Sequence, residues 1–264
     1  MKYKNKVVWI TGASSGIGEH LAYSFAEQGA KLILSSRNKK ELQRVKNNCP
    51  KDTDVLILPL DVSKFSSAEP AVKKVIDRFG FINILVNNAG ISQRELAIDT
   101  KLAVDQRIMN VNYIGVVALT KAVLPHFMHQ QFGHFVVISS VLGKMSVPHR
   151  SAYAASKHAL HGFFDALRAE LSLKNIKVTI ICPGYVHTNI MINALKGDGS
   201  RNNQMAPTTR RGIEPDVFAQ KAMQAIKQEK KEVMIAGFKE TTAVYIKRFM
   251  PSLYFRIIAS IKLG

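Results

Sequence analysis

The stretch Thr11-Gly-Ala-Ser-Ser-Gly-Ile-Gly18 follows the short apolar run Val7–Ile10 and leads into a segment of helical pattern that begins near Ile17. A strand that passes through a glycine-rich turn into a helix is the setting in which a dinucleotide pyrophosphate is bound. Backbone N–H groups and the helix dipole attract phosphate there. The spacing is Gly-x-x-x-Gly-x-Gly, and a purely structural turn is the alternative interpretation. The residues expected to hold the dinucleotide are Gly12, Ser14, Ser15, Gly16, Ile17 and Gly18.

Short apolar runs alternate with helical patterns along the rest of the chain, and the runs are continuous, which is typical of strands covered on both faces. We expect strands at Val7–Ile10, Leu32–Leu34, Val55–Leu58, Ile84–Val86, Phe135–Ile138, Val178–Ile181 and Val233–Ile235. Helices are expected between them, among others at Glu19–Gln28, Ala68–Phe79 and Ala152–Leu173. This rhythm predicts an α/β fold, a doubly wound Rossmann-type parallel sheet of about seven strands with helices on both faces. No change of composition marks a second domain, so one domain is expected over residues 1–264.

The composition limits the classes of partner. The 264 residues are 47% hydrophobic, which is enough for a sizeable core, and the formal net charge of +18 favours anionic ligands such as cofactors, lipid or nucleic acid. We expect no nucleic acid, because the chain has no basic run interleaved with aromatics and no recognised reading module. Cys49 and Cys182 lie far apart and match no metal spacing, so no metal is expected and a reducing compartment fits.

The two ends of the chain bear on localisation. The apolar run after Met1–Lys6 is only four residues long, against roughly 7–15 in a signal peptide, and no stretch approaches the ~20 apolar residues of a spanning helix. We therefore expect a soluble cytoplasmic protein. The tail Ala243–Gly264 forms an amphipathic extension (about residues 239–264) in which basic and apolar side chains alternate. It could contact a membrane surface peripherally, or pack on the body of the protein or on a sister subunit.

The residues after the second expected strand indicate the cofactor. An NAD site would have an acidic residue there, whereas this chain has Leu34-Ser-Ser-Arg-Asn38. Arg37, next to Ser36, can bind a 2′-phosphate with paired donors, which favours NADP(H) over NAD(H). The alternative is that Arg37 is one more surface cation. Asp61 and Val62 follow the third expected strand, where Asp61 could accept from the adenine amino group.

Tyr153 and Lys157 lie four residues apart on an expected helix, and this spacing places them on one face. A phenol titrates near pH ~10, and an ammonium within about 4–6 Å would lower that pKa by roughly 1–3 units, towards a range useful for acid–base catalysis. A chance pair is the alternative. The stretches Asn87–Gly90, Ser139–Ser140 and Cys182–Thr188 follow other strand ends, the side on which this architecture builds sites.

A Gly- and Asn-rich loop, Lys196–Gly212, also follows a strand end. We expect the surrounding segment, about residues 189–213, to be a mobile substrate lid, with an inert surface loop as the alternative.

In this order the motifs resemble the short-chain dehydrogenase/reductase family from Val7 to about Ile235: Thr11–Gly18, Asn87–Gly90, Asn112 within Asn-Tyr-Ile-Gly115, Ile138–Ser140, Tyr153–Lys157 and Pro183–Thr188. Further stretches resemble the dehydrogenase/reductase member 7 branch and the 11β-hydroxysteroid dehydrogenases: Val8–Thr11, Val86–Arg94, Ala155–Leu160 and Phe249–Ser252. Eukaryotic members of that branch often carry an amino-terminal membrane anchor. We see none here, so their membrane residence is not carried over.

The resemblance implies a role for each matching residue. Tyr153 would be the general acid–base, Lys157 would lower its pKa and hold the nicotinamide ribose, and Ser140 would bind the substrate oxygen. Asn112 would position a water that links Lys157 to solvent. The remaining positions would contact the cofactor: Asn88, Ala89 and Gly90 at the adenosine ribose, and Pro183, Gly184, Val186 and Thr188 towards the nicotinamide.

The resemblance implies an oxidoreductase that prefers NADP(H) and interconverts a small-molecule carbonyl and a secondary alcohol. It also implies a homodimer or homotetramer formed through the helices that hold Asn112 and Tyr153. Two alternatives remain, a non-catalytic NADP(H) sensor and a lipid or steroid carrier at a membrane surface. Ser139 is expected to be structural, and His158 and His161 to be packing or interface residues. His187 is expected to be a polar turn residue, with contact to the substrate as the alternative.

Overall fold

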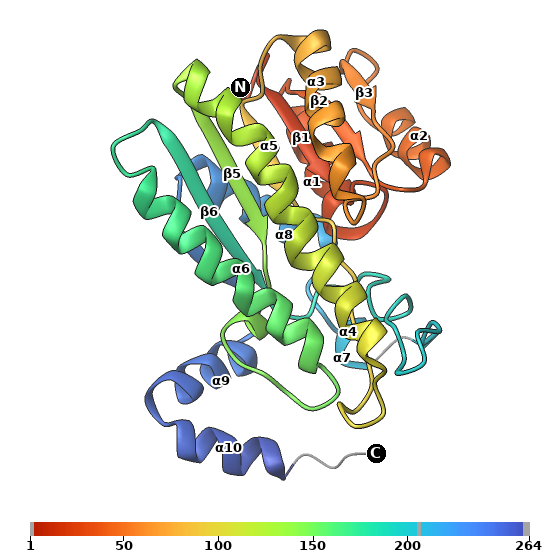
Figure 1. Cartoon of the computed structure of the whole chain (residues 1–264), viewed down its shortest axis with the longest axis vertical. Coiled ribbons are helices and arrows are strands. Elements are labelled where there is room, and N and C mark those ends of the chain that lie inside the picture. The colour runs from red at the N-terminus through yellow and green to blue at the C-terminus, as the bar shows by residue number, and fades with distance from the viewer. Residues whose placement is uncertain (1–2, 205–206, 261–264) are drawn as a thin grey trace.

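The computed structural model describes residues 3–204 and 207–260. Its seven parallel strands form one sheet in the order β3-β2-β1-β4-β5-β6-β7, which confirms the predicted fold (Figure 1). The order reverses between β1 and β4, and such a switch point is where open α/β sheets bind ligands, beyond the carboxyl ends of the strands. The strands are β1 (Val7–Thr11), β2 (Lys31–Ser35), β3 (Val55–Ile57), β4 (Ile84–Asn87), β5 (Gly133–Ile138), β6 (Ile176–Pro183) and β7 (Glu232–Ile235).

Successive side chains of each strand enter two separate cores. Val8 and Ile10 of β1 pack with Phe25 on the face covered by α1 and α8, while Val7 and Trp9 pack on the face covered by α3, α5 and α6 (Figure 1). Because both faces are covered, both sets are apolar, which explains the continuous apolar runs. The helices are α1 (Gly16–Glu27), α2 (Lys39–Asn47), α3 (Ala68–Phe79), α4 (Leu102–Met109), α5 (Gly115–Gln130), α6 (Ser151–Glu170), α7 (Pro207–Arg210), α8 (Pro215–Lys227), α9 (Phe238–Phe249) and α10 (Pro251–Ala259).

One long helix corrects the expectation about membrane spans. The segment Leu102–Gln130, which comprises α4, a π-helical segment and α5, is long and apolar enough to cross a membrane by length and composition alone. No continuous apolar run indicates this helix, because polar residues such as Asn110, Asn112, Thr120 and Lys121 interrupt the apolar ones. In the structure α5 packs against α3, α4 packs against α6, and Leu119 and Val123 enter the core of the sheet.

The tail and the long loop have structure of their own. The tail forms α9 and α10, which lie side by side beyond one end of the sheet (Figure 1). The expected loop is pinned by a bridge between Leu195 and Gln93 and includes the short helix α7. Residues 261–264 of the tail and 205–206 of the loop lie outside the described residues.

Candidate active site

The glycine turn between β1 and α1 requires its glycines for two different reasons. Gly12 and Gly16 have φ angles of +63° and +57°, which L side chains rarely adopt. At Gly18 the reason is space, since a Cβ there would lie 2.3 Å from the carbonyl oxygen of Gly12. The turn therefore presents bare backbone at the start of α1. The Ser15 side chain does not cap that helix, so its first N–H groups face the turn without a side-chain acceptor.

The end of β4 is fastened to this turn. The Thr11 hydroxyl donates to the carbonyl of Val86 (3.2 Å) and accepts from the N–H groups of Asn88 (3.0 Å) and Ala89 (3.1 Å). The Asn88 amide donates in return to the carbonyls of Thr11 (2.9 Å) and Gly12 (3.1 Å). The segment that begins at Asn88 is thus held directly beside the glycine turn.

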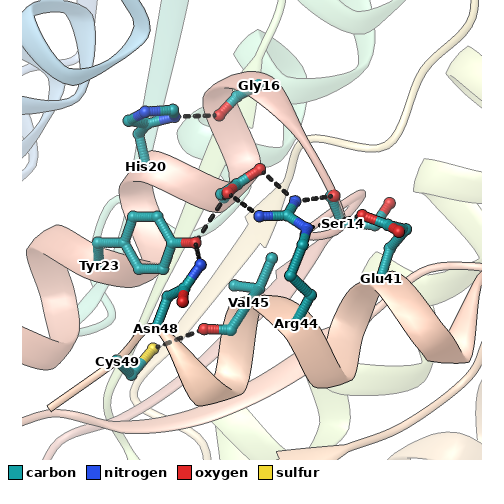
Figure 2. Close-up of polar contacts among 10 residues, drawn as sticks. Ser14, Gly16, His20, Tyr23, Glu41, Arg44, Val45, Asn48 and Cys49 are labelled. Carbon is teal, nitrogen blue, oxygen red and sulfur yellow. Dashed lines mark hydrogen bonds and ion pairs between the residues drawn. The ribbon is translucent and has the colours of Figure 1, made fainter.

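An ion-pair cluster outside the recognised motifs supports the turn from the other side. The Arg44 guanidinium of α2 donates to the Glu19 carboxylate of α1 (2.7 and 2.9 Å), to Glu41 (2.7 Å) and to the Ser14 carbonyl (3.2 Å) (Figure 2). Burial raises the pKa of Glu19, but hydrogen bonds from Arg44 and Tyr23 outweigh burial and the pKa is lowered. The sequence analysis missed this cluster, because 25 residues separate Glu19 from Arg44 and no local spacing joins them.

A cleft of about 870 Å³ opens at the carboxyl ends of the strands. Its volume lies in the range of small-molecule and cofactor sites. Together with the uncapped start of α1 and the bare glycine backbone, it fits a dinucleotide. Most residues expected to bind the cofactor line it: Gly12, Ser14, Ser15, Gly16, Ile17, Ser36, Arg37, Asp61, Val62, Asn88, Ala89, Gly90 and Thr188.

Arg37 lies at the exposed rim of the cleft, after β2. The next residue, Asn38, caps α2 by accepting from the N–H of Glu41 (3.2 Å), which fixes the backbone beside Arg37. Asp61 accepts from the hydroxyl (2.7 Å) and the N–H (3.0 Å) of Ser63. Burial raises the pKa of Asp61, but these hydrogen bonds and the positive charge of Arg37 outweigh burial and lower the pKa.

Tyr153 and Ser140 meet beside the cleft, and the Tyr153 hydroxyl forms a hydrogen bond with Ser140. The Lys157 ammonium lies 5.7 Å from the centre of the Tyr153 ring but donates to the carbonyl of Ile138 (2.8 Å). Burial raises the pKa of Tyr153, although the hydrogen bond to Ser140 and the charge of Arg150 oppose the rise. The expectation of a lowered tyrosine pKa is therefore wrong, because burial raises the pKa of Tyr153. Burial also lowers the pKa of Lys157 to about 8.

Asn112 lies fully buried in the π-helical segment Asn110–Ile114, and such segments are frequent at functional sites. Its side-chain oxygen accepts from the N–H of Ile91 (2.9 Å), and its amide donates to the carbonyl of Ile91 (2.9 Å) and to the Ser156 hydroxyl (3.0 Å). A Cβ on Gly90 would lie 3.3 Å from the Asn112 oxygen and 3.7 Å from the Lys157 nitrogen. Gly90, Asn112 and Lys157 therefore converge on one point.

The segment after β6 completes this edge of the site. The Gly184 N–H donates to the carbonyl of Ile235 (3.0 Å), and Val186 is buried and bridges to Ile213. Thr188 packs closely on Gly16 at the cleft, since a Cβ on Gly16 would lie 3.0 Å from the Thr188 methyl group. Several expected site residues lie beside or beneath the cleft and do not line it, namely Gly18, Asn112, Ser140, Tyr153, Lys157, Pro183, Gly184 and Val186.

A half-buried arginine near Tyr153 was also not indicated by the sequence. Arg150 donates to the Ser92 hydroxyl (3.0 Å), to the Gln93 carbonyl and to the sulfur of Met191 (2.8 Å), and burial lowers its pKa. These contacts connect the start of α6 to the segment of about residues 189–213, other residues of which line the cleft. No motif indicated Arg150, because its burial comes from segments distant in the chain.

The histidines near the site have partners within the protein. His161 lies 3.0 Å from the Ser139 hydroxyl and 3.3 Å from the Glu232 carboxylate. The hydrogen bond to His161 lowers the pKa of Glu232, burial opposes this effect, and with the further help of Lys144 the pKa falls to about 2. His187 pairs with Glu214 (3.0 Å) at the surface.

Comparisons with known proteins agree with this architecture. The family model described as short chain dehydrogenase matches residues 6–198. The chain is 44% identical over 262 residues to the dehydrogenase/reductase SDR family member 7B of Mus musculus, which covers 97% of this chain and 81% of the relative.

Two solved structures share the fold. A short-chain dehydrogenase/reductase from Burkholderia phymatum in complex with NAD has a TM-score of 0.85 at 23% identity, covering 96% of each chain. An alcohol dehydrogenase from the archaeon Thermococcus sibiricus complexed with 5-hydroxy-NADP has a TM-score of 0.76 at 26% identity, covering 88% of this chain and 96% of that one. The chain belongs to the short-chain dehydrogenase/reductase family, whose members are nicotinamide-dependent oxidoreductases of CH–OH and C=O groups.

Proposed function

We propose that this chain is an NADP(H)-preferring oxidoreductase that interconverts a small-molecule carbonyl and a secondary alcohol, with Tyr153 as the general acid–base. One observation carries the proposal. A phenol hydrogen-bonded to Ser140 lies over a buried ammonium, beside a cleft that fits a dinucleotide. A sensor without catalysis has no need of this arrangement, which is why we rank it second.

The side chains divide the work as follows. The bound cofactor supplies or accepts the hydride, while the protein binds, orients and polarises. Ser140 and Tyr153 bind the substrate oxygen, and in reduction Tyr153 donates its proton as negative charge develops there. The Lys157 ammonium favours the resulting phenolate. Its pKa of about 8 lets Lys157 exchange a proton with solvent near neutrality, and Asn112 fixes the Ile91 segment next to it.

The substitution Tyr153→Phe tests this assignment. It removes the proton donor and keeps the ring, so NADPH binding, followed by nucleotide fluorescence, should be unchanged. Turnover of any active compound in a carbonyl panel should fall by about 10²–10⁴-fold. The control is Tyr245→Phe, at an exposed position of α9. Turnover that survives in Tyr153→Phe would refute the assignment. A biological role that survives without turnover would favour the sensor.

Arg37 supports the preference for NADP(H). It follows β2 at the rim of the cleft, where an acidic residue would select NAD. One structural neighbour is described with NAD and the other with an NADP analogue, so the preference for NADP(H) has to be argued from the residues of this chain. Charge-assisted hydrogen bonds contribute about 1.5–3 kcal/mol, so Arg37→Ala should raise KM for NADPH by roughly 10–100-fold and leave KM for NADH unchanged. Lys40→Ala, on the exposed side of α2, is the control. Better turnover of the unaltered enzyme with NADH would overturn the preference.

We further propose one domain over residues 1–264, a substrate lid at about 189–213, and a homodimer or homotetramer formed through α4, α5 and α6. Exposed apolar residues on the first two helices support that interface, for example Leu102 and Met128. Sedimentation velocity would measure the oligomeric state. Both cysteines are buried free thiols, which supports the reducing cytoplasm as the compartment.

A further inference from the structure

Exposed apolar side chains gather on the hairpin formed by α9 and α10. Of the seventeen large apolar side chains that are exposed among the described residues, seven lie between residues 238 and 257. Phe238, Phe249 and Phe255 are 86%, 75% and 58% exposed. Single exposed apolar residues are ordinary on a protein surface, but a concentration of this kind marks an interaction site.

The same hairpin is basic and has no acidic residue after Glu240. Lys247, Arg248 and Arg256 lie on its helices, and residues 241–264 contain neither Asp nor Glu. The Lys247 ammonium lies 4.6 Å from the ring centre of Phe255, so cations and aromatic rings share one surface. Aromatic side chains mixed with cations suit the headgroup boundary of an anionic bilayer.

Charge also argues against a second copy of this chain as the partner that covers the exposed face of the hairpin. In a two-fold dimer the same patch meets itself, so two hairpins would place cations opposite cations. The whole chain has a net charge of +18, which adds to this repulsion and to the attraction of an anionic surface.

The other face of the hairpin is anchored near the candidate active site. Val244 and Tyr254 are buried against Val141 and Met145, and the Tyr254 hydroxyl donates to the carbonyl of Ser146. This segment directly follows Ser140. Figure 1 shows α9 and α10 beyond the carboxyl ends of β5 and β6, at the end of the sheet where α6 begins. A bilayer against the hairpin would therefore lie near the site.

We propose that the α9–α10 hairpin is a docking surface for anionic membranes, with Phe249 and Phe255 entering the headgroup region and Lys247, Arg248 and Arg256 binding lipid phosphates and carboxylates. The substrate class that fits this placement is a lipophilic carbonyl or alcohol dissolved in the bilayer. This last point rests on the proposed oxidoreductase function, whereas the docking itself does not.

Co-sedimentation of the full chain with vesicles tests the docking. Vesicles of phosphatidylcholine mixed with phosphatidylserine should bind the protein, phosphatidylcholine alone should bind it weakly, and added salt should reduce binding. The double variant Phe249→Ser, Phe255→Ser should bind at least about 10-fold more weakly because it loses apolar insertion. Lys247→Glu should abolish the preference for the anionic vesicles.

Three controls accompany the vesicle experiment. Leu173→Ser removes a side chain that is 96% exposed after α6, and its binding should be unchanged. Thermal unfolding and NADPH binding should show that each variant is folded. Tyr153→Phe should bind vesicles normally, so failure of the catalytic proposal and failure of docking are separate results.

Three outcomes would overturn the proposal. The first is equal binding of the double variant, and the second is no binding by the unaltered chain. The third is a dimer that the double variant loses in sedimentation velocity without vesicles, since this would show that a second copy covers the hairpin.

Discussion

The buried ammonium of Lys157 makes the stability of the protein depend on pH in a specific direction. Its side chain is 4% exposed, and burial lowers its pKa from 10.5 to about 8. Below pH ~8 the ammonium is charged in both the folded and the unfolded chain, so the folded state bears the full penalty of burying it. As pH rises from there to ~10.5, the folded state releases the proton first and the penalty disappears. Stability should therefore rise with pH over this window.

The magnitude follows from the two pKa values. Each pKa unit corresponds to about 1.4 kcal/mol, so a fall from 10.5 to about 8 is a penalty of about 3 kcal/mol when the ammonium is charged in both states. Between about pH 7 and about pH 10 most of this penalty is removed, which gives a change of about 2–3 kcal/mol. The substitution Lys157→Met abolishes the titration. Losses that do not depend on pH, such as the hydrogen bond to Ile138, shift its stability by a constant amount.

Urea unfolding at a series of pH values measures the effect. The free energy of unfolding of the unaltered chain minus that of Lys157→Met should rise by about 2–3 kcal/mol from about pH 7 to about pH 10. Other titrating groups occur in both proteins and cancel in the difference. Lys40→Met, at an exposed position, controls for the loss of one lysine and should show a constant difference. A constant difference for Lys157→Met as well would refute the argument that burial destabilises the charged form of this lysine.

Four further substitutions have defined outcomes. Gly18→Ala places a Cβ 2.3 Å from the Gly12 carbonyl oxygen and should destabilise the chain by roughly 1–3 kcal/mol. Gly162→Ala adds a Cβ on α6 that meets nothing within 4 Å and should stabilise the chain by about 0.5–1 kcal/mol. Thermal melts that rank the two variants otherwise would contradict the packing argument. Glu232→Gln should lower stability by about 1 kcal/mol at neutral pH, since the carboxylate is 36% exposed and its ion pairs are screened. The pKa of the Glu232 carboxylate falls to about 2 in the folded state, so its contribution to stability is fully present above the unfolded pKa of 4.5. The difference in unfolding free energy between the two proteins should therefore vanish as the pH falls from 4.5 to about 2. A difference that persists at lower pH would argue against the pairing. Arg44→Ala frees the Ser14 carbonyl and should raise the Kd for NADPH by about 10-fold in calorimetric titration; an unchanged Kd would mean that the glycine turn needs no support from α2.

The sheet could be predicted because its signal is local. Each apolar run needs only its own residues to be recognised as a strand covered on both faces, and all seven expected runs lie within observed strands or extend past their ends by one residue. The glycine turn was predictable for the same reason, since strand, turn and helix are contiguous in the chain. Spacing of four also placed Tyr153 and Lys157 on one helical face, where they lie.

Electrostatics around these residues could not be predicted in the same way. The spacing indicated that the ammonium lowers the pKa of Tyr153, yet the pKa is raised, because packing buries the phenol and the Lys157 proton points to Ile138. Contributions of Arg44 and Arg150 depend on partners up to 58 residues away in the chain, so no window of sequence contains them.

The amino-acid sequence by itself determined the order of the elements, the position of the glycine turn and the placement of Tyr153 and Lys157 on one helical face, since each depends on neighbours along the chain. Only the tertiary structure decided which groups are buried, which way the Lys157 ammonium points, and which face of the tail is anchored near Ser140 and which is exposed. The physical reason is that desolvation and long-range hydrogen bonds arise when distant segments pack together. Both α9 and α10 were visible as an amphipathic pattern, but an apolar stripe does not say whether protein or lipid covers it.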